Sequence, residues 1–341
     1  MKISDRSTRS IAAAMAALAI LAPISTAQAA VLKDVQLEPL RDAGKYAELE
    51  QKAQARLKAN AGDAEASAAL SLALTFLDAS DEKRLDAGAK QAKQCIEQHP
   101  AVAVCHLAAA QNLSMHMLNL GMFKAMRLLG TLKASWIRTL ELDPGSFVAR
   151  VELAKLYLAV PGMMGGSVSK ARELEEAVRA SQPETARIIR AYIAGEAKKW
   201  GEMEGELSAL KPGKDSALRE EVRGATMQLA QAFLKDGKDP AKARSLYETL
   251  LRTDPDHASG LYGLSRVHSA MGQPDQAIRN LEQARALRGA DDYPIDHRLG
   301  DAYLAKGNKA QAKAAYERYI ANKRANPGNA EEAKNSLAKL R

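Results

Sequence analysis

The sequence predicts an all-α protein, built as a solenoid of antiparallel helix pairs. Its 341 residues are 46% hydrophobic but only 4% aromatic, and the many alanines suit closely packed helices better than a β-sandwich. Apolar residues recur at helical spacing along most of the chain. Three helical stretches end at a proline, at Pro100, Pro144 and Pro183. Because proline cannot continue a helix interior, these prolines mark boundaries between units.

A repeat is clearest in the C-terminal half, where three sets of residues recur every 34 or 35 positions. The sets are Leu229, Leu264 and Leu299; Ala243, Ala277 and Ala312; and Tyr247, Leu281 and Tyr316. Small residues such as Ala277 and Ala312 would let the second helix of a pair approach the first, while Tyr303 or Phe233 fills the space above. A repeat array of this kind is not bound by the usual size limit of a single core.

The unit that ends the array carries Leu299-Gly300, Tyr303, Gly307, Ala312 and Tyr316. In this it resembles the tetratricopeptide repeat, a 34-residue helix pair with a small residue where its helices cross. The resemblance implies a right-handed α-solenoid and covers most of residues 43–341. It is close over 223–255, 258–289 and 293–325 and moderate over 63–100 and 147–183. Residues 101–144 form a lengthened pair, and 184–212 are degenerate, with Trp200 where a small residue is expected.

The expected organisation has four parts: a signal peptide over 1–29, an N-terminal segment and capping helix over 30–62, the repeat array over 63–325, and a C-terminal capping helix within 326–341. The first cap is the helix expected over 44–60. The helices expected to follow it span 63–79, 87–98, 102–118 and 122–142. The last cap, over 329–340, would cover the final apolar face, as solenoids require.

The first 29 residues have the pattern of a secretory signal. Lys2, Arg6 and Arg9 precede an apolar run over 11–24, and Ala27-Gln28-Ala29 resembles a cleavage site. An uncleaved anchor is the alternative, but the run is shorter than the roughly 20 residues that span a bilayer. We expect cleavage after Ala29, no transmembrane segment in the mature chain, and a periplasmic location.

The charge of the expected mature chain argues against a nucleic-acid partner. Without residues 1–29 it keeps 46 basic and 40 acidic residues, a net charge of +6. Basic and acidic residues alternate along the helices, no basic block stands out, and few aromatics could stack on bases. Paired carboxylates such as Glu175-Glu176 and Glu331-Glu332 are expected on solvated helix faces.

An insert interrupts one unit. The spacing from Tyr157 to Ala171 is fourteen residues, whereas Tyr303 to Ala312 is nine. The five additional residues belong to a glycine-rich loop of Pro161, Gly162, Met163, Met164, Gly165, Gly166 and Ser167. Glycines before a helix could form an anion-binding nest or contact a partner. The structural alternative is a loop in which glycines adopt positive φ and Ser167 caps the next helix.

Together with Tyr157-Leu158, this insert resembles a Tyr-Leu-x-x-Pro-Gly-x-x-Gly-Gly-Ser pattern of one branch of exported bacterial tetratricopeptide proteins. The resemblance implies a family but no activity. Methionines also gather here, and Met115-His116-Met117 suggests copper. Adjacent residues point to different sides of a helix, so we expect no metal site and no cofactor.

Cys95 and Cys105 each lie five residues from Pro100, the expected turn between two antiparallel helices. They should therefore sit at similar heights on facing helices. Since an exported chain meets an oxidising compartment, we predict a disulfide between them, provided that their Cα atoms come within roughly 7 Å. The alternative is two buried thiols. A redox-active pair is disfavoured, because nine residues separate the cysteines.

The sequence contains no recognisable catalytic motif, and its six histidines are scattered. We therefore expect no enzyme. In tetratricopeptide arrays the first helix of each pair lines a concave groove, and this resemblance implies a set of groove residues. They are Glu152, Lys155, Gln228, Gln231, Tyr262, Arg266, His297 and Asp301.

The sequence therefore predicts a non-catalytic periplasmic scaffold that binds a protein or peptide partner through this groove, with the insert as a second candidate contact. Preformed helices would lower the entropic cost of binding. The alternatives are an accessory subunit of a cell-envelope enzyme or transporter, with the insert as its contact, and a binder of a small anionic ligand.

Overall fold

The computed structural model describes residues 30–341 except 121, 236–237, 323 and 341. The expected signal peptide and its cleavage site lie outside the described residues. Within them the chain forms 17 α-helices and two short 3-10 helices, and its only β feature is an isolated bridge between His257 and Arg288. None of the described helices is both long and apolar enough to cross a membrane.

The helices of the N-terminal half are α1 (Glu38–Asp42), α2 (Tyr46–Ala59), α3 (Ala64–Leu77), α4 (Glu82–Gln98), α5 (Ala103–Asn119), α6 (Met122–Leu142), α7 (Phe147–Ala159), η1 (Gly162–Met164) and α8 (Val168–Glu176). Those that follow are α9 (Pro183–Glu196), α10 (Trp200–Ser208), α11 (Ser216–Lys235), α12 (Pro240–Thr253), α13 (Ala258–Ala270), α14 (Pro274–Ala284), η2 (Ala290–Asp292), α15 (Ile295–Ala305), α16 (Lys309–Ala321) and α17 (Pro327–Ala338).

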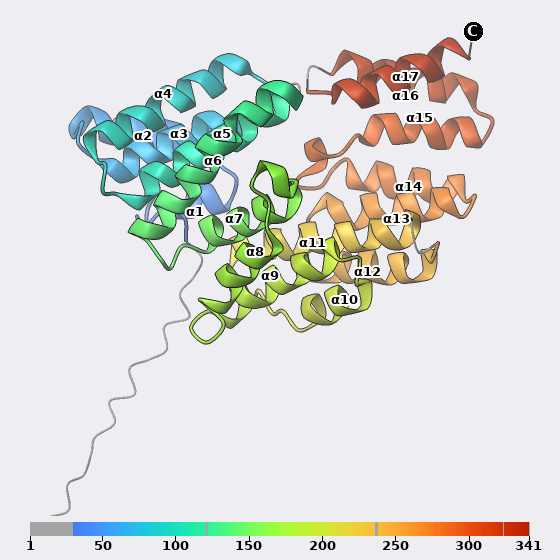
Figure 1. Ribbon diagram of the computed structural model, residues 1–341. Helices are drawn as coiled ribbons and strands as arrows, with labels where there is room; N and C mark the ends of the chain where they lie inside the picture. Colours follow the sequence, from blue (N-terminus) through green and yellow to red (C-terminus); the bar gives the residue numbers. More distant parts are fainter. Residues whose placement is uncertain (1–29, 121, 236–237, 323, 341) are drawn as a thin grey trace, which may run out of the picture.

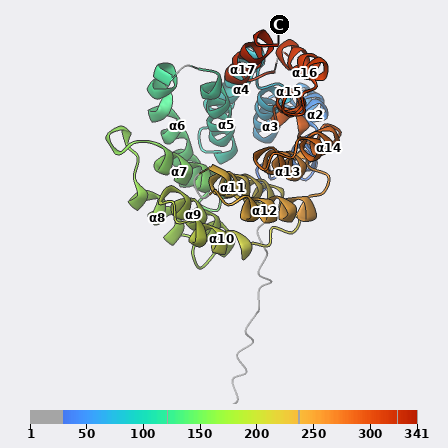
Figure 2. The same cartoon turned by 90° about the vertical axis from the view of Figure 1, so that its right-hand side faces the viewer.

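The helices stack as antiparallel pairs into a strongly curved α-solenoid (Figure 1). The curvature brings Arg324, which follows α16, to within 3.9 Å of Asp78 at the end of α3. The helices α15 to α17 themselves lie away from α2 and α3 in Figure 1, and Figure 2 views the curved stack from its C-terminal side. In the same view α10, α12 and α14 lie outside α9, α11 and α13. The first helices of these pairs therefore line the inner surface, as the repeat predicts.

Local sequence signals explain where the helices begin and end. Asp63 and Ser146 are N-caps whose side chains accept hydrogen bonds from the first helical turn. Proline occupies the first turn of α9, α12, α14 and α17, where its missing N–H costs nothing. Gly272 and Gly307 follow α13 and α15 with φ of 68° and 81°, which glycine adopts without strain.

All nine repeat positions in the C-terminal half are buried, which confirms the predicted register. Glycines on the first helices allow this packing. A Cβ on Gly263 would lie 2.0 Å from the ring of Tyr247, and one on Gly300 would lie 2.4 Å from the ring of Tyr316. Each tyrosine of a second helix thus packs directly on the backbone of a neighbouring first helix.

The structure corrects several sequence expectations. Helix α4 begins at Glu82, five residues before the expected start, because Asp81 caps it by accepting from the N–H groups of Lys83 and Arg84. A short helix, α1, precedes the expected N-terminal cap. The degenerate unit buries Met203 of α10 against Gly195, while Trp200 is half-buried at the helix start.

Candidate functional site

The first two expected groove residues join a polar cluster on the inner helices. Lys155 Nζ of α7 donates to Glu152 Oε1 at 2.6 Å and to Glu221 Oε1 of α11 at 3.2 Å. Tyr192 of α9 donates to Glu221 Oε2 at 2.6 Å. Burial and the nearby Glu221 raise the pKa of Glu152 although Lys155 opposes them. Three successive inner helices are thereby held together by one cation shared between two carboxylates.

The expected groove residues of the C-terminal half divide into two groups. Gln228 is exposed, and Gln231 accepts a hydrogen bond from Arg266 at 3.1 Å, so these side chains lie at the surface. The side chains of Tyr262 and His297 do not lie at the surface, since they are 6% and 1% exposed.

Both buried residues pack against aromatic rings of neighbouring elements. The ring of Tyr262 stacks on Tyr293 with centroids 4.6 Å apart, and that of His297 stacks on Tyr319 at 5.4 Å. Asp301 is half-exposed and accepts the hydroxyl hydrogen of Tyr316 at 2.8 Å. These contacts correct the register-based assignment, because the segment between α14 and α15 supplies Tyr293, which covers the face of Tyr262.

A chamber of about 860 Å³ opens where the N-terminal helices meet the C-terminal half. Its walls come from the α1–α2 junction, the first half of α11, the α12–α13 junction, the segment after α14, and Arg324. Ser216 of α11 donates to Asp42 Oδ1 at 2.7 Å and so joins opposite walls. The chamber is lined by six arginines, Arg41, Arg219, Arg223, Arg285, Arg288 and Arg324, and by five carboxylates, Asp42, Glu220, Asp254, Asp291 and Asp292.

One carboxylate organises two of these arginines. Asp254 accepts from Arg223 at 3.2 Å and from Arg288 at 2.9 Å. Arg219 lies one turn before Arg223 on α11, is exposed, and makes no ion pair with any described residue. This wall therefore holds two guanidinium groups on one carboxylate and a third, that of Arg219, one helical turn away, and guanidinium groups suit carboxylate or phosphate groups.

His257 lies beside this wall and is uncharged at neutral pH. Burial lowers its pKa to about 4, and the positive charges of Arg223 and Arg288 act in the same direction. Its Nδ1 accepts the N–H of Ser259 at 3.2 Å and caps α13. Gly289, with φ of 74°, passes so close that a Cβ there would lie 2.5 Å from His257 Nε2.

The insert has the structural features that its glycines and serine predict. Gly165 has φ of 92°, Ser167 accepts from the N–H of Lys170, and a Cβ on Gly166 would lie 1.6 Å from Val160 O. The N–H groups of residues 164 to 167 all bond to carbonyls of the loop or of α7. In this conformation those four groups are used internally rather than forming an anion nest.

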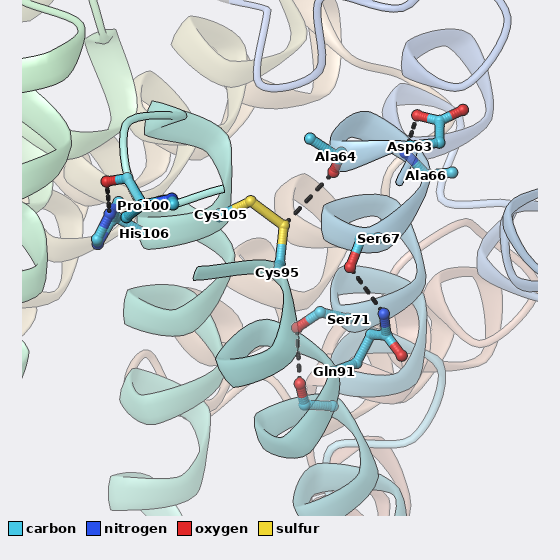
Figure 3. Close-up of a disulfide and its surroundings, with 11 residues drawn as sticks. Asp63, Ala64, Ala66, Ser67, Ser71, Gln91, Cys95, Pro100, Cys105 and His106 are labelled. Carbon is cyan, nitrogen blue, oxygen red and sulfur yellow. Dashed lines mark hydrogen bonds between the residues drawn. A yellow bond between two sulfur atoms is a disulfide. The ribbon is translucent and has the colours of Figure 1, made fainter. Parts of the chain in front are cut away.

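The expected disulfide is present. Cys95 and Cys105 are bonded, with Cα atoms 5.4 Å apart, and link the end of α4 to the start of α5 (Figure 3). Cys95 Sγ also lies 3.5 Å from Ala64 O of α3. The disulfide thus closes the α4–α5 hairpin at its turn. Both helices pack on α3.

The sequence pattern predicted the wrong environment for Glu175, and it did not predict the chamber. Glu175 was expected on a solvated face but is 1% exposed. It accepts from Arg179 at 2.7 Å and from Arg190 of α9, which joins successive units. Burial would raise its pKa, but the hydrogen bonds from both arginines outweigh burial, so the pKa lies below its usual value.

No cluster of three or more His, Cys, Asp or Glu side chains in the described chain could hold a metal ion.

A curved stack of helix pairs with a polar inner chamber defines a helical repeat protein of the scaffold type. Two models of the tetratricopeptide repeat match the sequence, over residues 233–293 and 297–322. Residues 233–293 and 297–322 are therefore similar to tetratricopeptide repeats. No curated protein is significantly similar in sequence.

Solved structures with the same fold include yeast Tom70 and the human IFIT1 dimer with m7Gppp-AAAA. Tom70 has a TM-score of 0.59 and 12% identity, covering 91% of this chain and 62% of that one. The IFIT1 dimer has a TM-score of 0.53 and 14% identity, covering 81% of this chain and 63% of that one. The chain thus spans less than two thirds of either protein's length, and these likenesses concern the fold alone.

Proposed function

We propose that this protein is a non-catalytic scaffold, exported to the periplasm, that holds a protein or peptide partner on its inner surface. The expected signal sequence and the resemblance of residues 157–167 to an exported branch of the family support export. Repeat arrays commonly use their concave face for binding. The m7Gppp-AAAA of the IFIT1 structure is that protein's ligand and is not transferred to this chain.

The chamber is the observation that carries the proposal. At about 860 Å³ it has the size of a ligand site, and its walls are rigid helices and a bridged loop. Its six arginines and five carboxylates fit a polar segment with charges of both signs better than an apolar one. Because Asp254 already orients Arg223 and Arg288, a carboxylate of the partner would meet preformed donors.

A second candidate, a small anionic ligand, is favoured by the same three arginines. The two candidates separate in one experiment on cell-envelope extracts. Cross-linking followed by affinity capture should retain a protein partner with the native chain and lose it with Arg219→Glu, which alters an exposed residue without an ion pair among the described residues. Arg172→Glu, the same charge change at an exposed position of α8, is the control.

Capture that survives Arg219→Glu, or that Arg172→Glu abolishes equally, would contradict binding in the chamber. Absence of any protein partner, together with a rise in unfolding temperature with inorganic phosphate or pyrophosphate, would favour the small anion instead.

A further inference from the structure

The lengthened helix pair is depleted of negative charge. Residues 98–140 contain neither aspartate nor glutamate, in a chain with 41 acidic residues among 341. The same holds for residues 153–172, which include the insert. These two stretches form α5, most of α6, and the loop that joins α7 to α8.

One stripe of α6 carries apolar and basic side chains outward. Phe123, Met126, Gly130 and Lys133 follow one another at spacings of three and four residues, so they share a helix face. Phe123 is 81% exposed, and Met126 and Gly130 are exposed as well. The buried residues Leu132 and Thr139 of α6 lie on the opposite side.

The insert continues this stripe. A small pocket between α6 and the loop is lined by Leu129, Gly130 and Lys133 from the helix and by Met164 and Gly165 from the insert. Met163, at the tip of the loop, is 96% exposed. Both views place the start of α6 and the insert on the same side of the molecule (Figures 1 and 2).

The basic residues of this region lack ionic partners among the described residues. Lys124, Arg127 and Lys133 make no ion pair with any described residue. Carboxylates approach the hairpin from α4, where Asp86 lies 4.0 Å from His116 Nε2 of α5. Arg127 and Lys133 thus flank the protruding apolar tips of α6 and the insert without an ionic partner in the described part of the chain, and Lys124 lies further round the first turn of α6.

We propose that this α6–insert patch, formed by Phe123, Met126, Met163, Lys124, Arg127 and Lys133, docks the protein on an anionic lipid surface. Separate apolar tips that protrude between cations can enter the headgroup region while the cations meet anionic lipids. Charge complementarity identifies the occupant, since an anionic bilayer supplies the negative charge that this face lacks. The patch lies on α6 and the insert, so docking does not depend on what the inner chamber holds.

The test is co-sedimentation of residues 30–341 with vesicles of equal parts phosphatidylglycerol and phosphatidylcholine, or of phosphatidylcholine alone. Residues 1–29 are removed because their apolar run would itself bind lipid. We expect binding to the anionic vesicles only, weakened between about 0.1 M and 1 M salt. The triple variant Lys124→Gln, Arg127→Gln, Lys133→Gln should lower partitioning roughly 100-fold, and Phe123→Ser with Met163→Ser about 10-fold.

Matched controls come from exposed residues elsewhere. Lys58→Gln, Lys83→Gln and Lys90→Gln remove the same charge from α2 and α4, and Val35→Ser with Met271→Ser removes exposed apolar side chains outside the patch. The controls should partition within about twofold of the native chain, which small surface effects allow. Lack of binding to the anionic vesicles would overturn the proposal. So would control variants that lose as much binding as the patch variants, or patch variants that bind like the native chain.

Discussion

The C-terminal units and the middle of the chain use one repeat in two ways. From α11 to α16 the turns are short, and glycines on the first helices receive tyrosines from the second helices. From α5 to α8 the pair is lengthened, the turn holds the insert, and apolar side chains face outward. Backbone contact therefore sets the geometry in the first region, whereas the second keeps a packed interior but extends its outer edge.

The comparison shows where each region tolerates change. In the C-terminal units the buried positions leave little freedom, since tyrosine rings contact helix backbone directly. In the middle region the additional residues lie at the surface, where insertions are tolerated. The regular units are thus suited to shape the chamber, and the middle is suited to acquire a separate contact surface.

Gly263→Ala is expected to have the largest effect. Its Cβ would lie 2.0 Å from the ring of Tyr247, which is 1% exposed and cannot move aside. The free energy of unfolding should fall by roughly 4 kcal/mol, above the usual range for overpacking. Gly224→Ala on α11, where nothing lies within 4 Å, should instead be neutral or stabilising by up to about 1 kcal/mol. Equal effects in urea titrations would break the comparison.

Acid should destabilise the C-terminal region through His257. Its folded pKa of about 4 lies below the unfolded value of 6.5, so the unfolded chain binds the proton first. Stability is complete above pH 6.5 and falls as the pH drops towards 4, by about 3 kcal/mol in all. His257→Asn keeps an N-cap acceptor and should flatten this part of the profile. Chemical denaturation at several pH values measures how the free energy of unfolding depends on pH. If stability falls as steeply with pH in the variant as in the native chain, His257 is not the group responsible.

Removing the disulfide between Cys95 and Cys105 should destabilise the α4–α5 hairpin. The disulfide closes a loop of ten residues in sequence separation, for which loop entropy predicts slightly under 3 kcal/mol. Cys95→Ser with Cys105→Ser should lose that much stability, and hydrogen exchange should rise first in α4 and α5. The native chain, denatured without reductant, should show no free thiol. Two titratable thiols per chain would contradict the bond.

The smallest effect is expected in the insert. Gly166→Ala places a Cβ 1.6 Å from Val160 O, so the loop must shift, at a cost of about 1 to 2 kcal/mol that stays local. Limited proteolysis should then cleave within residues 160–167 while the unfolding temperature changes little. Gly162→Ala, which meets nothing within 4 Å, is the control. Faster cleavage of the Gly162→Ala control than of Gly166→Ala would show that the close contact between Gly166 and Val160 O does not fix the loop.

Much of the fold was predictable because short-range signals agree with the repeat. The 34 and 35 residue spacings located the buried leucines, alanines and tyrosines, and the symmetry about Pro100 located the disulfide. The start of α4 was missed because the Asp81 cap lies before any apolar periodicity. Local signals of this kind are present in the sequence and could have been found.

The candidate site was less predictable because curvature assembles it. Residues from Arg41 to Arg324 meet in the chamber, and no pattern along the chain indicates that they approach. Tyr262 was misassigned because its cover, Tyr293, comes from an irregular segment between units. Glu175 was misassigned because Arg190, which helps neutralise it, lies in the next unit. Each error arises from contacts that the repeat register does not specify.

Binding on the inner surface is tested most directly by a photo-reactive residue at one inner and one outer position. Gln228 is exposed on α11, and Arg244 is exposed on α12, the outer helix of the same pair. Irradiation of the chain in envelope extracts should give a protein adduct from position 228 and none from position 244. Adducts from position 244 alone, or equally from both, would contradict a scaffold that works through its inner face.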